Sequence, residues 1–401
     1  MSDSIYPYHQ GGKETRYRQL LTRLHDDLDI TVYTMHWWPE RARIRRNYGI
    51  NYEAICPLIP LYTAHRRSFR EAVAFACACT RLLGRRFDVV EADHMPYLQL
   101  FTLRLVTTVK RRPLVVTWHE VWGREYWVQY LGRLVGTIAW WIERNAMRLP
   151  DEILAVSEET RDRLRLFLGD STPVRVIHNA IELDVIARVD PAASQESAEL
   201  LYVGSLLKHK GVHLLIDSLA RLRTVRDVHL LVVGDGPERR NLEQQVAALG
   251  LAERVSFRVD VAEQEEIFGL MKAAKVFVFP SVREGFGIAP LEALACGTPV
   301  VTTSHPNNNA RELVARSDRG YVAEPTVEAL TACIEKALAD DTERPRLVET
   351  WLKEFDWSTA ADEYLAALVA SLGARSSRRG IPLQRGRKGT STVADNGESR
   401  E

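Results

Sequence analysis

The stretch from Phe279 to Val300 reads FPSVREGFGIAPLEALACGTPV, and it predicts how the second half of the chain folds. The apolar run Val276–Phe279 ends at Pro280, which is typical of a buried strand that stops at a turn. A short loop follows, and Pro290 suits the first turn of a helix, because the N–H that proline lacks has no partner there. We therefore expect a strand, a loop and a helix in this order, the repeating unit of parallel α/β sheets.

The loop of this stretch carries the residues that we expect to contact a ligand. These are Glu284, Gly285, Phe286 and Gly287, and Glu292 lies eight residues after Glu284, inside the helix. Free amides and the helix dipole make such a loop a site for anions, whereas carboxylate oxygens accept hydrogen bonds from sugar hydroxyls. Two glutamates at this spacing are common by chance, but together with the glycines and the proline they favour a nucleotide sugar.

As a whole, the string resembles the signature of glycosyltransferase family 4, and a weaker resemblance extends from about Tyr6 to about Leu368. Members of this family are retaining enzymes with the GT-B fold. The resemblance implies two Rossmann-like, doubly wound parallel-sheet domains that face a cleft, with a C-terminal helix crossing back to the first domain. It also implies a nucleoside-diphosphate sugar as co-substrate, no cofactor and no metal. In the implied front-face reaction, the leaving phosphate takes the acceptor proton.

Composition agrees with a two-domain enzyme. The 401 residues exceed the size at which one core usually splits, and 46% are hydrophobic. Lys plus Arg equals Asp plus Glu, so net charge gives no reason to expect nucleic-acid binding. The five cysteines are odd in number and scattered, which favours a reducing compartment. We see no secretory signal, and we expect a cytoplasmic protein.

Alternating apolar runs and helical segments divide the chain into four parts. We expect an N-terminal acceptor-side domain at 1–185, a nucleotide-sugar-binding domain at 186–354, a crossover helix at 355–372 and a disordered basic tail at 373–401. The first residues resemble the loop after a strand, yet no strand precedes them. A misassigned start or a missing first strand would explain this, and we favour the former.

The stretch from Val203 to Gly211 predicts the charge that stabilises the leaving diphosphate. A strand ends near Gly204 and a helix begins after Gly211, so Lys210 lies at the cleft edge of the sheet. In the family that this chain resembles, an arginine usually follows the first glycine, but here that position is Ser205. Lys208 and His209 are the candidate helpers.

Three further elements complete the predicted site. Gly11 and Gly12 precede a helix, where their amides can approach a sugar or phosphate, as in the N-terminal glycine loop of the family. His119 follows the strand Leu114–Trp118 and can hydrogen-bond the sugar or the acceptor. Arg258 lies where relatives grip the nucleobase, but the usual glycine is absent, so the base stays open.

Another departure is a pair of asparagines, Asn308 and Asn309, where relatives often have two glycines. Asparagine tolerates positive φ better than most residues, so we expect the pair to keep the same backbone. The only Asp-x-Asp spacing noted, Asp27 to Asp29, precedes a strand rather than following one. This position supports metal-independent transfer.

The sequence thus predicts a retaining glycosyltransferase with His119, Lys210 and Glu284 as catalytic residues and a saccharide, glycolipid or lipid-linked acceptor. Two alternatives stay open: a nucleotide-sugar epimerase of similar shape, and a non-catalytic sugar-nucleotide-binding subunit that supports a partner transferase.

The segment from Trp122 to Met147 is rich in aromatic residues. We expect it mainly to pack inside the N-terminal domain; the alternative is that Trp140 and Trp141, with the basic tail, attach the protein peripherally to an anionic membrane at the cytoplasmic face.

Overall fold

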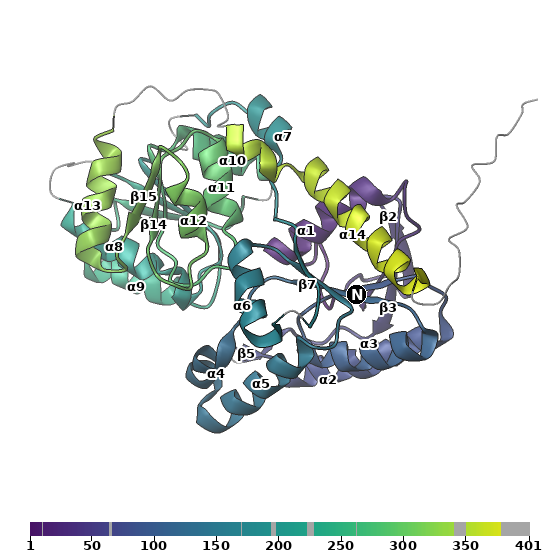
Figure 1. Cartoon of the computed structure of the whole chain (residues 1–401). Coiled ribbons are helices and arrows are strands. Elements are labelled where there is room, and N and C mark those ends of the chain that lie inside the picture. The colour runs from purple at the N-terminus through teal and green to yellow at the C-terminus, as the bar shows by residue number, and fades with distance from the viewer. Residues whose placement is uncertain are drawn as a thin grey trace, which may run out of the picture.

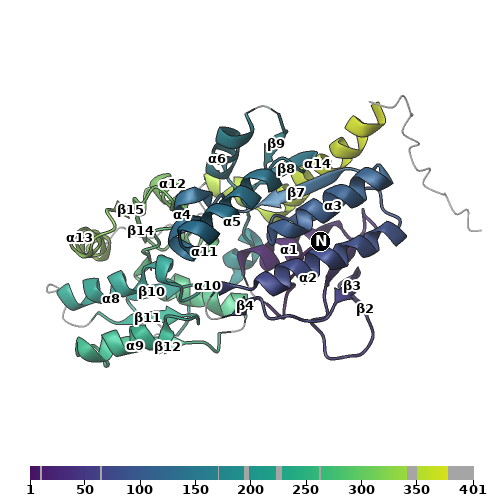
Figure 2. The ribbon, with the colours of Figure 1, turned by 90° about the horizontal axis from the view of Figure 1, so that it is seen from below.

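The computed structural model describes residues 1–9, 11–63, 66–169, 171–193, 198–222, 228–261, 263–340 and 350–377. The chain forms two α/β domains, each built on parallel strands with helices packed against them (Figure 1). Four helices line the lower edge of the N-terminal domain in Figure 1 and face the viewer in Figure 2: α2 (Phe69–Ala78), α3 (Tyr97–Lys110), α4 (Gly123–Leu131) and α5 (Arg133–Ala146).

The C-terminal domain contains a six-stranded parallel sheet with the order β12-β11-β10-β13-β14-β15. Its strands are β10 (Leu200–Val203), β11 (Leu230–Val233), β12 (Val255–Arg258), β13 (Val276–Phe279), β14 (Val300–Thr303) and β15 (Gly320–Ala323). The order reverses between β10 and β13, and ligands of open α/β sheets bind beyond the carboxyl ends of strands at such a switch point. The loops with Lys210 and Glu284 follow these two strands.

The helices of this domain differ in how much they bury: α8 (Val212–Arg221) buries an apolar stripe, whereas α11 (Ile288–Ala295) is buried over most of its length. In α8 the stripe is Val212, Leu215, Ile216 and Leu219, at helical spacing. The helical elements are η2 (Lys208–Lys210), α8 (Val212–Arg221), α9 (Arg239–Ala248), α10 (Gln264–Ala273), α11 (Ile288–Ala295), α12 (Ala310–Ala315) and α13 (Val327–Leu338). All four residues of β13 are buried, as expected for a strand covered on both faces.

The N-terminal domain contains two larger sheets, of which one is the parallel sheet β6-β7-β8-β9 and the other has the order β1-β3-β2. The strands are β1 (Thr31–Met35), β2 (Ile44–Asn47), β3 (Ile50–Cys56), the short pair β4 (Tyr62–Thr63) and β5 (Arg66–Arg67), β6 (Val90–Asp93), β7 (Leu114–Trp118), β8 (Glu152–Ala155) and β9 (Val174–Val176). The first two residues connect the sheets, because Ser2 N donates to Tyr33 O and Asp93 N donates to Met1 O, both at 3.2 Å.

The N-terminal domain contains six α-helices and one 3₁₀-helix among its described residues. They are α1 (Gly12–Leu24), α2 (Phe69–Ala78), η1 (Cys79–Gly84), α3 (Tyr97–Lys110), α4 (Gly123–Leu131), α5 (Arg133–Ala146) and α6 (Glu158–Leu168), and α7 (Leu183–Arg188) follows on the way to the second domain. None of the helices in the described part of the chain combines the length and apolar composition that crossing a bilayer requires.

The predicted crossover helix is confirmed as α14 (Trp357–Ser377), which follows η3 (Thr350–Phe355) and packs on α1 of the N-terminal domain (Figure 1). Trp357 and Tyr364 are almost fully buried there. The prediction that a disordered tail begins at residue 373 is wrong for its first five residues, because the helix continues through Gly373 to Ser377. The rest of the predicted tail, residues 378–401, lies outside the described residues.

Candidate active site

Lys210 and Glu284 meet at the switch point of the C-terminal sheet. Lys210 Nζ lies 2.5 Å from Glu284 Oε2, and both side chains are mostly buried. The two loops lie directly against each other: Val282 N donates to His209 O at 2.9 Å. Gly211 has φ +72°, and a Cβ there would lie 2.1 Å from Pro280 O, so only glycine fits this close approach. The predicted catalytic lysine and glutamate therefore share one site.

The backbone of Glu284 is fixed by the loop that follows β14. Glu284 N donates to Asn307 O at 2.9 Å, and Asn309 N donates to Glu284 O at 3.0 Å. Asn309 has φ −69°, and among the described non-glycine residues only Tyr48 and Arg111 have positive φ. The two asparagines therefore lie outside the positive-φ region and do not use their tolerance for it.

Instead, the two asparagines brace the site through their side-chain amides. Asn309 Nδ2 donates to Gly285 O at 3.0 Å, and Asn308 Nδ2 donates to Thr303 O at 2.8 Å. Asn308 is fully buried. Side-chain hydrogen bonds of these asparagines thus hold Gly285 and the end of β14 beside each other.

The remaining loop residues shape the start of α11. Gly287 has φ +100°, and a Cβ there would lie 2.6 Å from the Cβ of Ala310, so a side chain does not fit. The Phe286 ring packs against the rings of His178 and Phe355, with centroids 5.9 and 5.8 Å away. Phe286 therefore anchors the loop through its ring, and the loop can offer only its backbone to a ligand at this residue.

Glu292 lies one turn into α11 and is 9% exposed. It accepts a hydrogen bond from Gln264 Nε2 at 2.9 Å. Burial raises the pKa of Glu292 from the ordinary 4.5 to about 8, so the carboxyl is mostly neutral at pH 7. A buried carboxyl that can both donate and accept hydrogen bonds is suited to a pair of ligand hydroxyls at this edge of the sheet.

The raised pKa makes Glu292 a destabilising residue at alkaline pH. The folded protein holds this proton more tightly than the unfolded chain, so stability is full below about pH 4.5, falls as the pH rises to about 8 and then stays constant. The side chain in Glu292→Gln stays neutral at every pH. The free energy of unfolding of this variant, relative to that of the wild type, should therefore rise by about a few kcal/mol as the pH increases from about 4.5 to about 8. Thermal denaturation at pH 5 and pH 9 measures this, and an equal difference at both values would contradict it.

The other predicted donor residues of this domain contribute less charge. Ser205 and Lys208 are solvent-exposed. Burial, followed by the nearby Lys210, lowers the pKa of His209 to about 4, so His209 is neutral at pH 7. Arg258 is already engaged, with Nη2 2.7 Å from Glu266 and Nε 3.2 Å from Asp260. Lys210 is thus the charged group that the β10 loop brings to Glu284.

His119 approaches this loop from the N-terminal domain. A Cβ on Gly285 would lie 2.6 Å from His119 O, so the two domains touch at this glycine. His119 Nε2 is 3.8 Å from Asp93 Oδ1, and burial lowers the pKa of His119 to about 3. The imidazole is therefore neutral at pH 7, and it can donate or accept a hydrogen bond but carries no charge.

The glycine pair lies where the domains converge. Gly11 caps α1, and a Cβ on Gly12 would lie 3.5 Å from Ile288 Cδ1 at the start of α11. The next residue, Lys13, was not predicted: its Nζ is 2.9 Å from Asp93 Oδ2. Burial alone would lower the pKa of Lys13, but three neighbouring carboxylates raise it, so this lysine is charged. It fixes the carboxylate beside His119.

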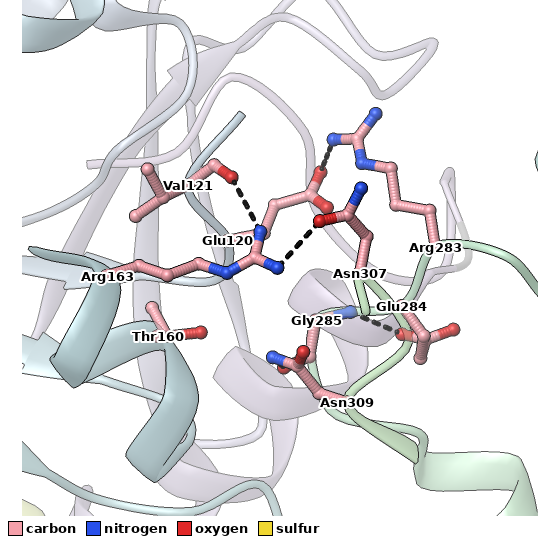
Figure 3. A pocket seen from close by; sticks show the side chains of 9 residues that line it. All are labelled: Glu120, Val121, Thr160, Arg163, Arg283, Glu284, Gly285, Asn307 and Asn309. Carbon is pink, nitrogen blue, oxygen red and sulfur yellow. Dashed lines mark hydrogen bonds and ion pairs between the residues drawn. The ribbon is translucent and has the colours of Figure 1, made fainter. Parts of the chain in front are cut away.

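Sequence reasoning also missed the contacts that close the cleft. Arg283 Nη2 lies 2.6 Å from Glu120 Oε1 (Figure 3). The Arg283 guanidinium also stacks 3.6 Å from the ring centre of Tyr126. Arg163 Nη2 donates to Asn307 Oδ1 at 2.7 Å. A small open pocket remains between these groups, lined by Glu120, Val121, Thr160, Arg163, Arg283, Glu284, Gly285, Asn307 and Asn309 (Figure 3). Both Glu120 and Arg283 adjoin predicted site residues, which is the one signal that pointed to them.

Comparison with known families agrees with this geometry. Residues 10–185 match the profile of Glycosyltransferase Family 4, and residues 186–352 match that of Glycosyl transferases group 1. The two matches together span residues 10–352, and the chain belongs to the family 4, group 1 glycosyltransferases. This glycosyltransferase is 28% identical over 288 residues to α-D-kanosaminyltransferase of Streptomyces kanamyceticus, covering 67% of this chain and 73% of the relative. It is 30% identical over 285 residues to glycogen synthase of Mycobacterium tuberculosis, covering 68% and 66%.

Solved structures show that the glycosyltransferase has the GT-B fold. Sucrose-phosphate synthase of Thermosynechococcus elongatus superimposes with a TM-score of 0.75 at 20% identity, over 91% of this chain and 94% of that one. HepE of Anabaena, solved with UDP and glucose, superimposes with a TM-score of 0.69 at 20% identity, over 92% and 98%.

Proposed function

We propose that this glycosyltransferase moves a sugar from a nucleoside-diphosphate sugar to a saccharide, glycolipid or lipid-linked acceptor, with retention of the anomeric configuration and without a metal ion. The observation that carries the proposal is the Lys210–Glu284 pair at the switch point of the C-terminal sheet, covered by the His119 loop of the other domain. A cation for a diphosphate and a carboxylate for sugar hydroxyls meet there, next to the loop that carries the neutral His119.

Each of these groups has a role in the proposed reaction. Glu292 accepts hydrogen bonds from the ribose hydroxyls, and the amides near Gly285–Gly287 contact the phosphates. Lys210 leaves Glu284 and pairs with the diphosphate, which frees the Glu284 carboxylate for the transferred sugar. Neutral His119 hydrogen-bonds that sugar from the opposite side of the cleft.

The bonds change at one carbon. The bond from the anomeric carbon to the phosphate oxygen breaks, and the acceptor oxygen forms a new bond on the same face. The acceptor proton passes to the leaving phosphate oxygen, whose charge Lys210 stabilises. No protein nucleophile takes part, and His119 is not an imidazolium acid at neutral pH because its pKa is lowered to about 3.

The relatives suggest which donors to test first. HepE was solved with UDP-glucose, and another relative, from Mycobacterium tuberculosis, is a GDP-mannose-dependent mannosyltransferase. A donor panel should therefore include UDP-sugars and GDP-sugars. We also propose that the enzyme works in the cytoplasm, attached peripherally to the inner face of the membrane when the acceptor is lipid-linked.

Nucleotide release from this panel, with and without acceptor saccharides and with and without EDTA, tests the proposal. We expect release from one class of donor, stimulated by acceptor and unchanged by EDTA. Loss of activity with EDTA that manganese or magnesium restores would contradict metal independence. Acceptor-independent release would favour an epimerase, and tight donor binding without release would favour a non-catalytic subunit.

A further inference from the structure

Three neighbouring helices of the N-terminal domain expose large apolar side chains at helical spacing. On α5, Leu134 is 77% exposed and Trp141 is 60% exposed, and Ile138 lies between them on the same face. On α3, which packs between α2 and α5, Leu105 is 60% exposed. We name the whole set the apolar face: Phe69 and Val73 of α2; Phe101, Leu105 and Val109 of α3; Leu134, Val135, Ile138 and Trp141 of α5.

The buried side of α5 fixes this orientation. Glu143 is fully buried and accepts hydrogen bonds from Trp127 Nε1 at 2.9 Å and from Trp122 N at 2.7 Å. A Cβ on Gly136 would lie 2.2 Å from Trp127 O, so α5 packs on α4 as closely as a helix can. Turning the apolar side chains inward would break the Glu143 hydrogen bonds and separate the two helices. Their exposure is therefore a built feature of the fold.

This arrangement is unusual for a surface without a partner. Exposed large apolar side chains of the C-terminal domain stand singly, as Leu249, Val259 and Val322 do among its described residues. Single exposed apolar residues are normal, but a set that runs along three neighbouring helices is typical of a surface that another phase or molecule covers.

Charge identifies what covers it. Arg133, Arg144 and Arg148 are exposed on or just after α5, and Arg111 is exposed just after α3. Glu143 is the one carboxylate in the sequence of α5, and it points inward. An apolar face flanked by arginines matches a bilayer surface with acidic headgroups, where the apolar side chains reach the acyl boundary and the arginines meet phosphates.

We propose that the apolar face docks this enzyme on an anionic lipid bilayer. Trp141 belongs to this face, whereas Trp140 is half-buried with the Arg144 guanidinium 5.6 Å from its ring centre, so the sequence-based pairing of the two tryptophans is corrected here. Helix α4 links the face to the cleft, because it packs on α5 and its Tyr126 stacks on Arg283. This part of the inference rests on the proposed function: through α4, a lipid-linked acceptor in the bilayer can reach the active site.

Co-sedimentation with vesicles tests the surface directly. Full-length protein is mixed at low salt with vesicles of phosphatidylcholine, alone or with phosphatidylglycerol. The wild type should bind the anionic vesicles and bind the neutral ones less. The variant Leu134→Gln/Ile138→Gln/Trp141→Gln should lose at least about tenfold in partitioning, and Arg133→Gln/Arg144→Gln about fivefold per arginine. The matched control, Leu166→Gln/Leu249→Gln, changes exposed leucines outside the face and should bind like the wild type.

Several outcomes overturn the proposal. If the wild type stays in the supernatant with anionic vesicles, the apolar face does not dock the protein on a bilayer. Equal binding by the triple variant and the wild type would lead to the same conclusion. A concentration-dependent dimer that only the triple variant loses, seen by sedimentation velocity, would show that a second copy covers the face. Nucleotide release by the same variants separates this question from the proposed function: vesicle binding without release in any protein would refute the function alone.

Discussion

Lys210→Ala should slow turnover about a hundredfold to a thousandfold, the usual loss when one strong electrostatic stabiliser of a leaving group is removed. Lys210 is the charged side chain beside Glu284, and neither the exposed Ser205 nor the neutral His209 can replace its charge. Donor affinity should fall less than turnover, because charge on the diphosphate grows most as the sugar leaves. Nucleotide release at saturating donor measures the effect.

Lys208→Ala is the matched control for this prediction. Lys208 lies two residues away but is exposed, so its removal should change turnover by no more than a few fold. If Lys210→Ala also stayed within a few fold of the wild type, the assigned role of Lys210 would be wrong. A large loss in Lys208→Ala alone would move that role to Lys208.

Alanine substitutions of Glu292 and Glu284 should have different effects on nucleotide binding and on turnover. Glu292→Ala should weaken binding of the free nucleotide and of the nucleotide sugar alike, by about tenfold to a hundredfold, since hydrogen bonds to the ribose are lost in both. Glu284→Ala should leave nucleotide affinity close to normal and reduce turnover, because we propose that its carboxylate, paired with Lys210 here, binds the transferred sugar. Calorimetry with nucleotide and kinetics with donor measure the two effects.

Glu265→Ala is a fitting control, because Glu265 is an exposed carboxylate on α10, next to the Gln264 that contacts Glu292. Its affinity and turnover should match those of the wild type. Unchanged nucleotide affinity in Glu292→Ala would show that Glu292 does not bind the ribose.

Buried parallel strands could be predicted well from the sequence. The predicted bounds of Leu114–Trp118 and Val276–Phe279 are those of β7 and β13, because strands covered on both faces are continuous apolar runs. The hairpin of β2 and β3 was missed, since β2 is Ile-Arg-Arg-Asn and stays half exposed. The edge strand β15 was missed for the same reason.

The candidate site was predictable where strand ends converge. Lys210 and Glu284 follow adjacent parallel strands, so their meeting follows from the sheet order. The contact of Arg283 with Glu120 was not predictable, because these residues come from different domains and no local pattern relates them. The brace by Asn308 and Asn309 was not predicted, because the sequence does not show which backbone carbonyl groups lie near their side-chain amides.

The anomeric configuration of the product tests the central claim most directly. Wild-type enzyme, the donor selected by nucleotide release and its acceptor should give a glycoside whose proton NMR coupling constant matches an α-linkage when the donor is α-linked. Lys210→Ala under the same conditions should give only traces of that product. A β-linked product, or nucleotide release without any glycoside, would contradict retaining transfer in this cleft.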